Sequence, residues 1–283
     1  MMDSVKLNAN AKINLTLNIT GTLENGYHTI ESFICPVSLA DGITITKTDN
    51  EKIVITCDKP HIPLGQTNLC YKAAERFFTE YGIVNDGLQI DIHKVIPDQA
   101  GLGGGSADAA VVLRGLCSMY GVKEDERLFE IGFSVGADVP FCIKNKPSFV
   151  TGMGENLVET SPIPDCYIVI VKPDFGSSTQ IAYSKYDSME KYVRHDSNRM
   201  KDAISKSDLD LICGNLWNIF EELLDIDEIF SIKNRLKKFG AIGSSMSGSG
   251  TAVFGIFSNE KMAENAVRNF RSNYPSTFLS TPL

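Results

Sequence analysis

The sequence Gln99-Ala-Gly-Leu-Gly-Gly-Gly-Ser-Ala-Asp-Ala-Ala110 is the most informative stretch of this 283-residue chain. It places four glycines, at positions 101, 103, 104 and 105, directly before a predicted helix that begins near Ser106. Glycines let backbone N–H groups approach a ligand closely, and a helix start adds unpaired N–H donors and a partial positive charge. Together these features predict a phosphate-binding loop. The alternative is a glycine-rich turn that only caps the helix.

Three better-known glycine motifs do not fit this loop. A P-loop requires a lysine after its last glycine, where this chain has Ser106 and Ala107. The dinucleotide fingerprint requires a glycine or alanine at the position of Ser106. A protein-kinase glycine loop would be followed by V-A-I-K and H-R-D motifs, and neither occurs in the sequence. The loop therefore indicates another class of phosphate-binding protein.

The composition of the whole chain excludes several classes of protein. It has 43% hydrophobic and 22% charged residues, as in a globular protein, and its net charge of −8 argues against nucleic-acid binding. No apolar run approaches the roughly 18 residues of a membrane span, and the N-terminus resembles neither a signal peptide nor a transit segment. Seven scattered cysteines without a C-x-x-C motif indicate free thiols, and the dispersed histidines argue against a zinc site. We expect a cytoplasmic protein without a membrane or nucleic-acid partner, and the sequence leaves its oligomeric state open.

Hydrophobic periodicity predicts an α+β fold. Residues 5–19 alternate between apolar and polar side chains, which predicts a long strand with Lys12 on its polar face. From residue 106 onward apolar side chains recur at helical spacing, with Ser106 as the predicted N-cap and Gly121 as the predicted stop. Hairpins and helices mix without regular βαβ alternation. Strands are expected at 5–19, 28–37, 43–48, 52–57, 88–96, 149–158 (a pair), 167–171, 241–244, 252–257 and 277–280, and helices at 68–81, 106–120, 124–135, 179–189, 209–224, 228–239 and 259–272.

Two further features of this pattern concern the organisation of the chain. The strands at 43–48 and 52–57 are expected to form a hairpin, and Trp217 is expected to lie on an amphipathic helix. The turn Ser161-Pro-Ile-Pro164 separates two regions of different character. We therefore expect two domains, at residues 1–160 and 161–283.

Five short motifs follow one another along the chain: A-K-I-N-L at 11–15, G-Y-H at 26–28, the glycine loop at 101–110, G-A-D-V-P at 136–140 and M-S-G-S-G at 246–250. In this order they resemble the GHMP kinase superfamily, over residues 9 to 257. G-Y-H after A-K-I-N-L, with G-A-D-V-P, favours the branch that acts on a cytidine-diphosphate-linked methylerythritol over homoserine, mevalonate or galactose kinases. Asn10 replaces a proline that the family usually has before A-K, and Asp98 to Ala100 replace a glycine-rich lead-in.

The resemblance implies a fold and an activity. The fold would be the two-domain GHMP kinase architecture, with a ribosomal-protein-like ATP-binding domain at 1–160 and a ferredoxin-like domain at 161–283. The activity would be phosphorylation of the 2-hydroxyl of the cytidine-diphosphate-linked polyol by ATP with Mg²⁺, in non-mevalonate isoprenoid precursor biosynthesis. Another small-molecule kinase of the superfamily, or a non-catalytic nucleotide-binding protein on the same scaffold, remains an alternative.

The resemblance also implies roles for individual residues. Lys12 and Asp138 would be the catalytic pair, because a carboxylate can accept the proton of an attacking alcohol and a lysine favours the ionised carboxylate. Taken alone, the two residues are better explained without catalysis, Lys12 as an exposed strand lysine and Asp138 as a turn residue. Asn14, Tyr27, His28 and Tyr183 would bind the substrate, although hairpin-turn or core-packing roles would also explain the last three. The ATP-binding residues would be Gly101, Gly103, Gly104, Gly105 and Ser106 at the phosphates and Asn68, Leu69 and Lys94 at the adenine; Ser106 would also be a candidate Mg²⁺ ligand.

Overall fold

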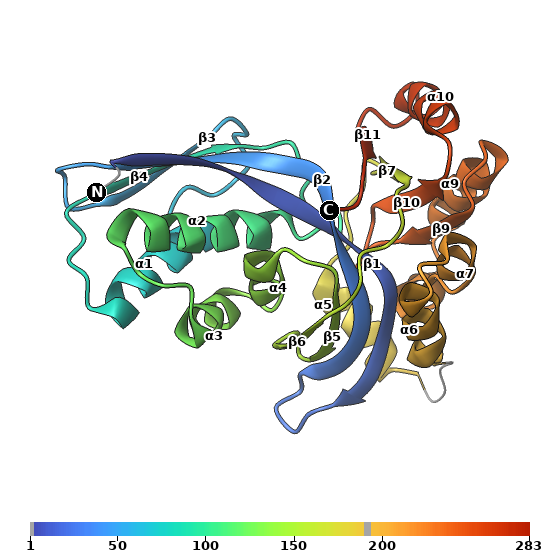
Figure 1. The fold of residues 1–283 in the computed structure, drawn as a ribbon, viewed down its shortest axis with the longest axis horizontal. Coiled ribbons are helices and arrows are strands. Elements are labelled where there is room, and N and C mark those ends of the chain that lie inside the picture. Colours follow the sequence, from blue (N-terminus) through green and yellow to red (C-terminus); the bar gives the residue numbers. More distant parts are fainter. Residues whose placement is uncertain (1–2, 190–193) are drawn as a thin grey trace. The chain divides into compact units, whose positions relative to one another are not determined.

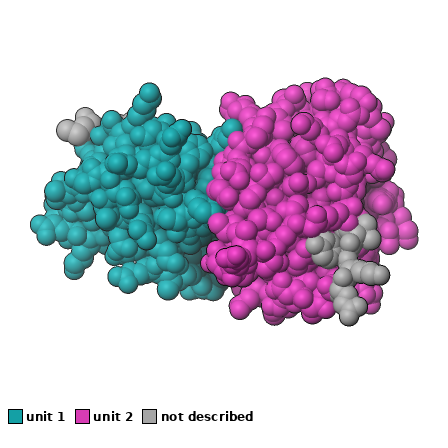
Figure 2. All heavy atoms as spheres, turned by 90° about the horizontal axis from the view of Figure 1, so that it is seen from below, with its two compact units in different colours: residues 1–11, 40–96, 103–145 teal, residues 12–39, 97–102, 146–283 magenta. Residues whose placement is uncertain are grey.

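A computed structural model describes residues 3–189 and 194–283 of the chain. Met1 and Met2, which precede the first predicted strand at 5–19, lie outside the described residues. The chain separates into two compact units (Figure 2): unit 1 consists of residues 1–11, 40–96 and 103–145, and unit 2 of residues 12–39, 97–102 and 146–283. Both units are built from several chain segments. The predicted domain boundary near residue 160 stays a prediction.

Unit 1 consists of strands covered by helices, in agreement with the predicted α+β class (Figure 1). Its strands follow the order β3-β4-β2-β1, and β3 runs parallel to β4. The strands are β1 (Ser4–Thr22) and β2 (His28–Lys47), which both continue into unit 2, with β3 (Ile53–Cys57) and β4 (Leu88–His93). The helices are α1 (Leu69–Tyr81), α2 (Gly104–Tyr120), α3 (Glu126–Val135) and α4 (Val139–Lys144).

Unit 2 contains a second sheet with the antiparallel order β11-β7-β10-β9. Its core includes the large side chains of Phe220, Phe257 and Phe270, which are fully buried. The strands of this sheet are β7 (Tyr167–Val171), β9 (Gly243–Met246), β10 (Val253–Phe257) and β11 (Thr277–Ser280). Unit 2 also contains β5 (Ser148–Gly152), β6 (Asn156–Glu159) and β8 (Trp217–Asn218), which belong to the sheet of β1 and β2. The helices are α5 (Thr179–Asp187), α6 (Ser197–Ser205), α7 (Leu209–Gly214), α8 (Ile219–Leu224), α9 (Asp227–Lys238) and α10 (Glu260–Arg271).

Helix α1 shows how local sequence signals fix an element. The side chain of Asn68 accepts a hydrogen bond from the backbone N–H of Cys70, and Gly82 ends the helix in the left-handed region at φ 62°. Asparagine is a preferred N-cap, and glycine is preferred where φ is positive. The predicted helix at 68–81 is therefore confirmed.

Helix α2 begins two residues earlier than the sequence predicts. Gly103 is the N-cap residue, with a φ of 70°, and the helix starts at Gly104. Ser106 lies in the first turn, so the prediction that it is the N-cap is wrong. A glycine reaches the left-handed region at no steric cost, which lets the chain enter the helix without a side-chain cap.

The predicted hairpin of residues 43–48 and 52–57 is also wrong. β2 continues without interruption from His28 to Lys47, and β4 lies between β2 and β3.

The segment around Asp41 and Gly42 has the composition of a turn. It nevertheless stays in the strand, because the buried Asp41 side chain accepts hydrogen bonds from the backbone N–H groups of Val95 and Ile96.

The predicted helix at 209–224 is interrupted. α7 ends at Gly214, the two residues of β8 pair with β1, and α8 then begins. Trp217 therefore lies in a strand opposite Thr16, and the prediction that it is helical is wrong. The side chain of Asn218 caps α8 by accepting from the N–H of Phe220, which restarts the helix there.

Other findings concern the chain as a whole. The helices α4 and α6 were not expected from the sequence. All seven cysteines are free, and six of them are buried. In the part of the chain that the structure describes, no helix combines the length and apolar character needed to cross a bilayer.

Candidate active site

Lys12 is buried on the polar face of β1. The residue is only 4% exposed, so it is not an ordinary surface lysine of a strand. Its ammonium group donates to the side-chain oxygen of Asn14 at 2.7 Å. The Asn14 amide in turn donates to Ser32 Oγ on β2 at 2.8 Å. Because residues two apart on a strand share a face, the A-K-I-N-L motif itself sets the direction of the ammonium group.

The first glycine of the motif, Gly101, lies in unit 2, beside β1 and a second loop, which consists of residues 247–252 between β9 and β10. The N–H of Lys12 donates to the carbonyl of Leu102 at 3.0 Å, and Ser247 Oγ donates to the carbonyl of Gly101 at 2.8 Å. Gly101 has a φ of 73°, and a Cβ there would lie 1.9 Å from the carbonyl oxygen of Ser247. Position 101 therefore requires glycine, and β1, the glycine motif and the second loop are held together.

Two buried side chains that the sequence did not single out shape the second loop. Asn218 donates through its amide to the carbonyls of Met246, at 2.7 Å, and Gly248, at 2.8 Å. Glu221 accepts from the hydroxyl of Ser245 at 2.8 Å and from the N–H of Met246 at 2.6 Å. These two residues differ from other polar residues of the chain only in being buried. The sequence predicted a helix at their positions, and a polar residue in a predicted helix does not reveal that it is buried.

The later glycines of the motif lie in unit 1, at the start of α2. Gly103 has a φ of 70°, and its carbonyl accepts from the N–H of Ala107 at 2.8 Å. The first N–H groups of a helix lack partners within the helix, so those that follow Gly103 can bind an anion. A triphosphate fits this stretch chemically, because the three successive glycines at 103–105 expose backbone without side chains.

The G-A-D-V-P motif lies in the same unit, close to Ser106. A Cβ on Gly136 would lie 3.8 Å from Ser106 Oγ. Asp138, two residues later, is the N-cap residue of α4, which packs on α2. Asp138 therefore precedes a helix rather than a strand. Unit 1 thus brings the G-A-D-V-P motif and the start of α2 into one region of the fold.

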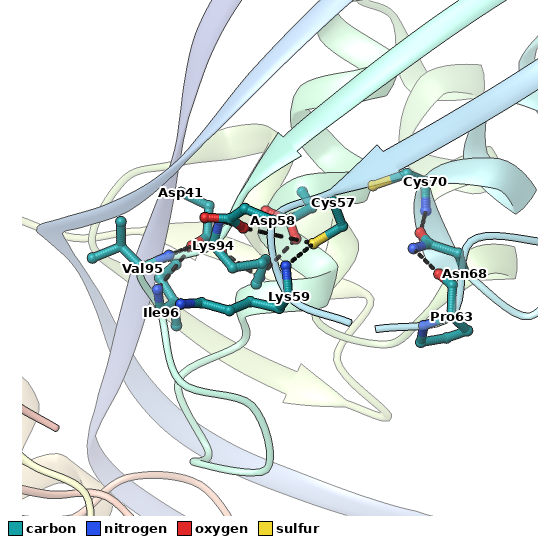
Figure 3. A network of polar contacts seen from close by, with 11 residues as sticks. Asp41, Cys57, Asp58, Lys59, Pro63, Asn68, Cys70, Lys94, Val95 and Ile96 are labelled. Atoms are coloured by element: carbon teal, nitrogen blue, oxygen red, sulfur yellow. Dashed lines mark hydrogen bonds and ion pairs between the residues drawn. The ribbon is translucent and has the colours of Figure 1, made fainter. Parts of the chain in front are cut away.

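The three residues predicted to bind adenine also lie in unit 1. A Cβ on Gly105 would contact the side chain of Leu69 at 3.5 Å, so the start of α1 lies beside the loop. The Asn68 amide group donates to the carbonyl of Pro63 at 2.7 Å while its oxygen caps α1 (Figure 3). The Asn68 side chain thus fixes the turn that leads into α1.

The side chains of Lys94 and Asp41 lie together (Figure 3), and the Lys94 ammonium group is bound to protein carboxylates. The group donates to Asp41 and, at 2.8 Å, to Asp108. Burial lowers the pKa of Lys94, but Asp108 and Asp41 outweigh burial and hold the pKa above its usual value. Burial, with a contribution from Asp41 and against the opposing effect of Lys94, raises the pKa of Asp108 to about 7. Neither carboxylate was singled out from the sequence as a site residue.

All four predicted substrate-binding residues lie in unit 2: Asn14, described above, and Tyr27, His28 and Tyr183. The rings of His28 and Tyr183 stack, with centroids 4.6 Å apart and planes inclined by 23°. His28 Nε2 is 2.7 Å from a carboxylate oxygen of Asp187, which fixes the imidazole ring. Tyr27, at the end of the turn, is 65% exposed. Packing of Tyr183 edge-on against the core residue Phe220 adds a structural role to the predicted one.

Comparisons with known proteins agree with the motifs. The GHMP kinases N terminal domain model matches residues 68–146, and the GHMP kinases C terminal model matches residues 189–276. The 4-diphosphocytidyl-2-C-methyl-D-erythritol kinase of Clostridium tetani is 39% identical over 279 residues, which cover 98% of this chain and 99% of the relative. The protein of the same name from Acetivibrio thermocellus is 40% identical over 282 residues, covering 99% of each chain.

Solved structures show the same fold. A crystal structure of 4-(cytidine 5'-diphospho)-2C-methyl-D-erythritol kinase matches with a TM-score of 0.82 and 29% identity, covering 98% of this chain and 99% of the other. Homoserine kinase from Cytophaga hutchinsonii matches with a TM-score of 0.80 and 18% identity over 100% and 95% of the two chains, a likeness of fold alone. With relatives of this identity along its full length, the chain belongs to the GHMP kinases, in the family of the 4-diphosphocytidyl-2-C-methyl-D-erythritol kinases.

Proposed function

We propose that this protein transfers the γ-phosphoryl group of ATP to the 2-hydroxyl of 4-diphosphocytidyl-2-C-methyl-D-erythritol. The observation that carries the proposal is the buried Lys12 ammonium group, aimed by Asn14 from a strand that is hydrogen-bonded to the glycine motif at Leu102. The names of full-length relatives at 39% and 40% identity support the choice of substrate. The free thiols suit a reducing compartment, so we place the reaction in the cytoplasm.

In this proposal Lys12 and Asp138 act on the reacting hydroxyl. The substrate oxygen forms a bond to the γ-phosphorus as the bond to the β-phosphate oxygen breaks, and ADP leaves. Asp138 accepts the proton that the hydroxyl loses, a form of base catalysis that is typically worth about 10²–10⁴-fold. Lys12 stabilises the negative charge of the transferred group.

The glycine motif would bind the triphosphate through backbone N–H groups, with Gly101, Gly103, Gly104, Gly105 and Ser106 as its residues. Asn68, Leu69 and Lys94 would form the adenine pocket, which the contact between positions 69 and 105 supports. The Ser106 hydroxyl would be a Mg²⁺ ligand, since a hydroxyl oxygen suits this ion beside phosphate oxygens. Bound Mg²⁺ would neutralise much of the triphosphate charge.

The substrate would be held in unit 2. Asn14 would contact it near the reacting hydroxyl, while Tyr27, His28 and Tyr183 would bind the cytosine. The stacked pair of His28 and Tyr183 supports this assignment, because both are aromatic and lie together. An exposed Tyr27 ring is available to a flat ligand.

A substrate panel tests the proposal. Purified protein with ATP and Mg²⁺ should form ADP when 4-diphosphocytidyl-2-C-methyl-D-erythritol is added, and at least about a hundredfold more slowly with homoserine, mevalonate or galactose. Equal rates with one of these compounds would assign the protein to another kinase activity. Binding of ATP without phosphoryl transfer to any member of the panel would favour a non-catalytic nucleotide-binding protein.

A further inference from the structure

Three charged side chains are buried together behind the start of α2. The side chains of Lys94, Asp41 and Asp108 are 8%, 0% and 5% exposed, respectively. The ammonium group donates to one oxygen of each carboxylate. Because burying a charged group is costly, the partners of Lys94 must compensate for its removal from water.

The cluster joins three elements of unit 1. Asp41 belongs to β2, Lys94 directly follows β4, and Asp108 lies in the second turn of α2. The second oxygen of Asp41 accepts from the N–H groups of Val95 and Ile96 (Figure 3). Asp41 therefore holds both the side chain of Lys94 and the backbone that leaves β4.

Gly104, in the glycine loop, lies directly against this cluster. A Cβ on Gly104 would lie 3.3 Å from the ammonium nitrogen of Lys94 and 3.0 Å from a methyl carbon of Ile96. Asp108 has one buried oxygen without a hydrogen-bond partner in the described residues, so Lys94 is the cation that compensates its burial. Any shift of the ammonium group would move the first residue of α2 or leave the two carboxylates facing each other.

We propose that Asp41, Lys94 and Asp108 are positioning residues of the triphosphate loop, which set the affinity for the nucleotide by holding the start of α2 in place. Asp41 and Asp108 do this without touching the nucleotide. The inference rests on the proposed function, because it takes the loop at 101–106 as the triphosphate site. It adds two acidic residues, and a role for the Lys94 side chain, to the residues that the glycine motif provides.

The first test replaces the cation. Lys94→Met should raise the KM for ATP at least about tenfold, because a small misplacement of a binding group is costly. The kcat at saturating ATP and the KM for the alcohol substrate should stay within about threefold of the wild-type values. Lys146→Met is the matched control, because Lys146 forms an exposed ion pair with Glu159 at 3.0 Å. It should leave all three constants unchanged.

A second variant separates positioning from direct contact. Asp41→Asn keeps Lys94 but places an amide NH₂ against a donor, either the ammonium group or the backbone N–H groups at 95 and 96. The KM for ATP should rise at least about fivefold, as expected for loss of a hydrogen bond to a charged group. If the Lys94 ammonium group acted only by touching the nucleotide itself, Asp41→Asn would leave the KM for ATP unchanged or lower it, and this result would overturn the proposal.

Hydrogen exchange gives a readout that does not need turnover. In Lys94→Met without nucleotide, amides of residues 94–108 should exchange faster than in the wild type, while those of β7 and β10 should not change. If Lys94→Met does not fold, Lys94→Met/Asp108→Asn removes one uncompensated carboxylate and should show the same local effect. Unchanged exchange in a folded variant, or an equal rise in both KM values, contradicts the inference. Lack of kinase activity in the wild type would contradict the proposed function instead, and leave the exchange result to decide on the cluster.

Discussion

The burial of Lys12 could not be predicted from the sequence. Alternation along β1 predicted its place on a polar face, but not that this face is buried, with Asn14 and Ser32 completing a hydrogen-bonded row. Burial depends on which strands and loops cover a face, and those contacts come from distant parts of the chain. The A-K-I-N-L motif identified the residue, and the structure supplied the reason for its orientation.

The proposed roles of Lys12 and Asp138 lead to the first prediction. Lys12→Ala and Asp138→Asn should each lower kcat at least about a hundredfold, because each removes a group that acts on the reacting atoms. Steady-state rates at saturating substrates measure this, and circular dichroism checks the fold. Lys6→Ala, on the same strand but exposed, should keep the wild-type rate. A near-wild-type rate for Lys12→Ala or Asp138→Asn would remove that residue from the catalytic pair.

Asp108 leads to a prediction about pH. Its pKa is raised by burial to about 7, from a usual value of 3.8. A carboxyl group whose pKa is higher in the folded than in the unfolded state stabilises the fold fully below the unfolded value, and this contribution is lost as the pH rises through the folded value. Compared with Asp108→Asn, the wild type should therefore lose stability between pH 5 and about pH 7. Chemical unfolding of both proteins across this range measures the difference, and parallel curves would contradict the raised pKa.

At the scale of elements, local signals predicted helices better than strand pairings. The cap residues Asn68 and Gly82 fixed the ends of α1, since capping acts within a few residues. The parallel pairing of β3 with β4 could not be predicted from such local signals, because it joins residues that are far apart in the sequence. The break before α8 was missed for the same reason: Trp217 pairs with a residue of β1.

The contact between the glycine motif and the second loop gives a prediction at this scale. Gly101→Ala places a methyl group against the carbonyl of Ser247 and also requires a positive φ, so it should destabilise the protein by about 2–5 kcal/mol. Gly82→Ala is the matched control, because Gly82 has a φ of 62° but no atom within 4 Å of the added Cβ. It should cost only about 1–2 kcal/mol, the strain of the left-handed conformation. Urea unfolding compares the two variants, and equal losses would show that the crowding at Gly101 is unimportant.

At the scale of the whole molecule, the order of five motifs predicted the family, and the comparisons confirmed it. Of the predicted site residues, unit 2 contains Lys12, Asn14 and Gly101, and unit 1 contains Gly103, Ser106 and Asp138. The sequence did not reveal the supporting residues Asp41, Asp108 and Asn218. Their types are common in turns and caps, and only tertiary contacts distinguish them from such residues.

The position of the transferred phosphate tests the central claim most directly. The protein should be incubated with γ-labelled ATP, Mg²⁺ and 4-diphosphocytidyl-2-C-methyl-D-erythritol, and the product examined by phosphorus and carbon NMR spectroscopy. We predict one new phosphate monoester, with phosphorus–carbon coupling to the carbon that bears the 2-hydroxyl. Label found only in inorganic phosphate, or on another hydroxyl of the polyol, would contradict the account.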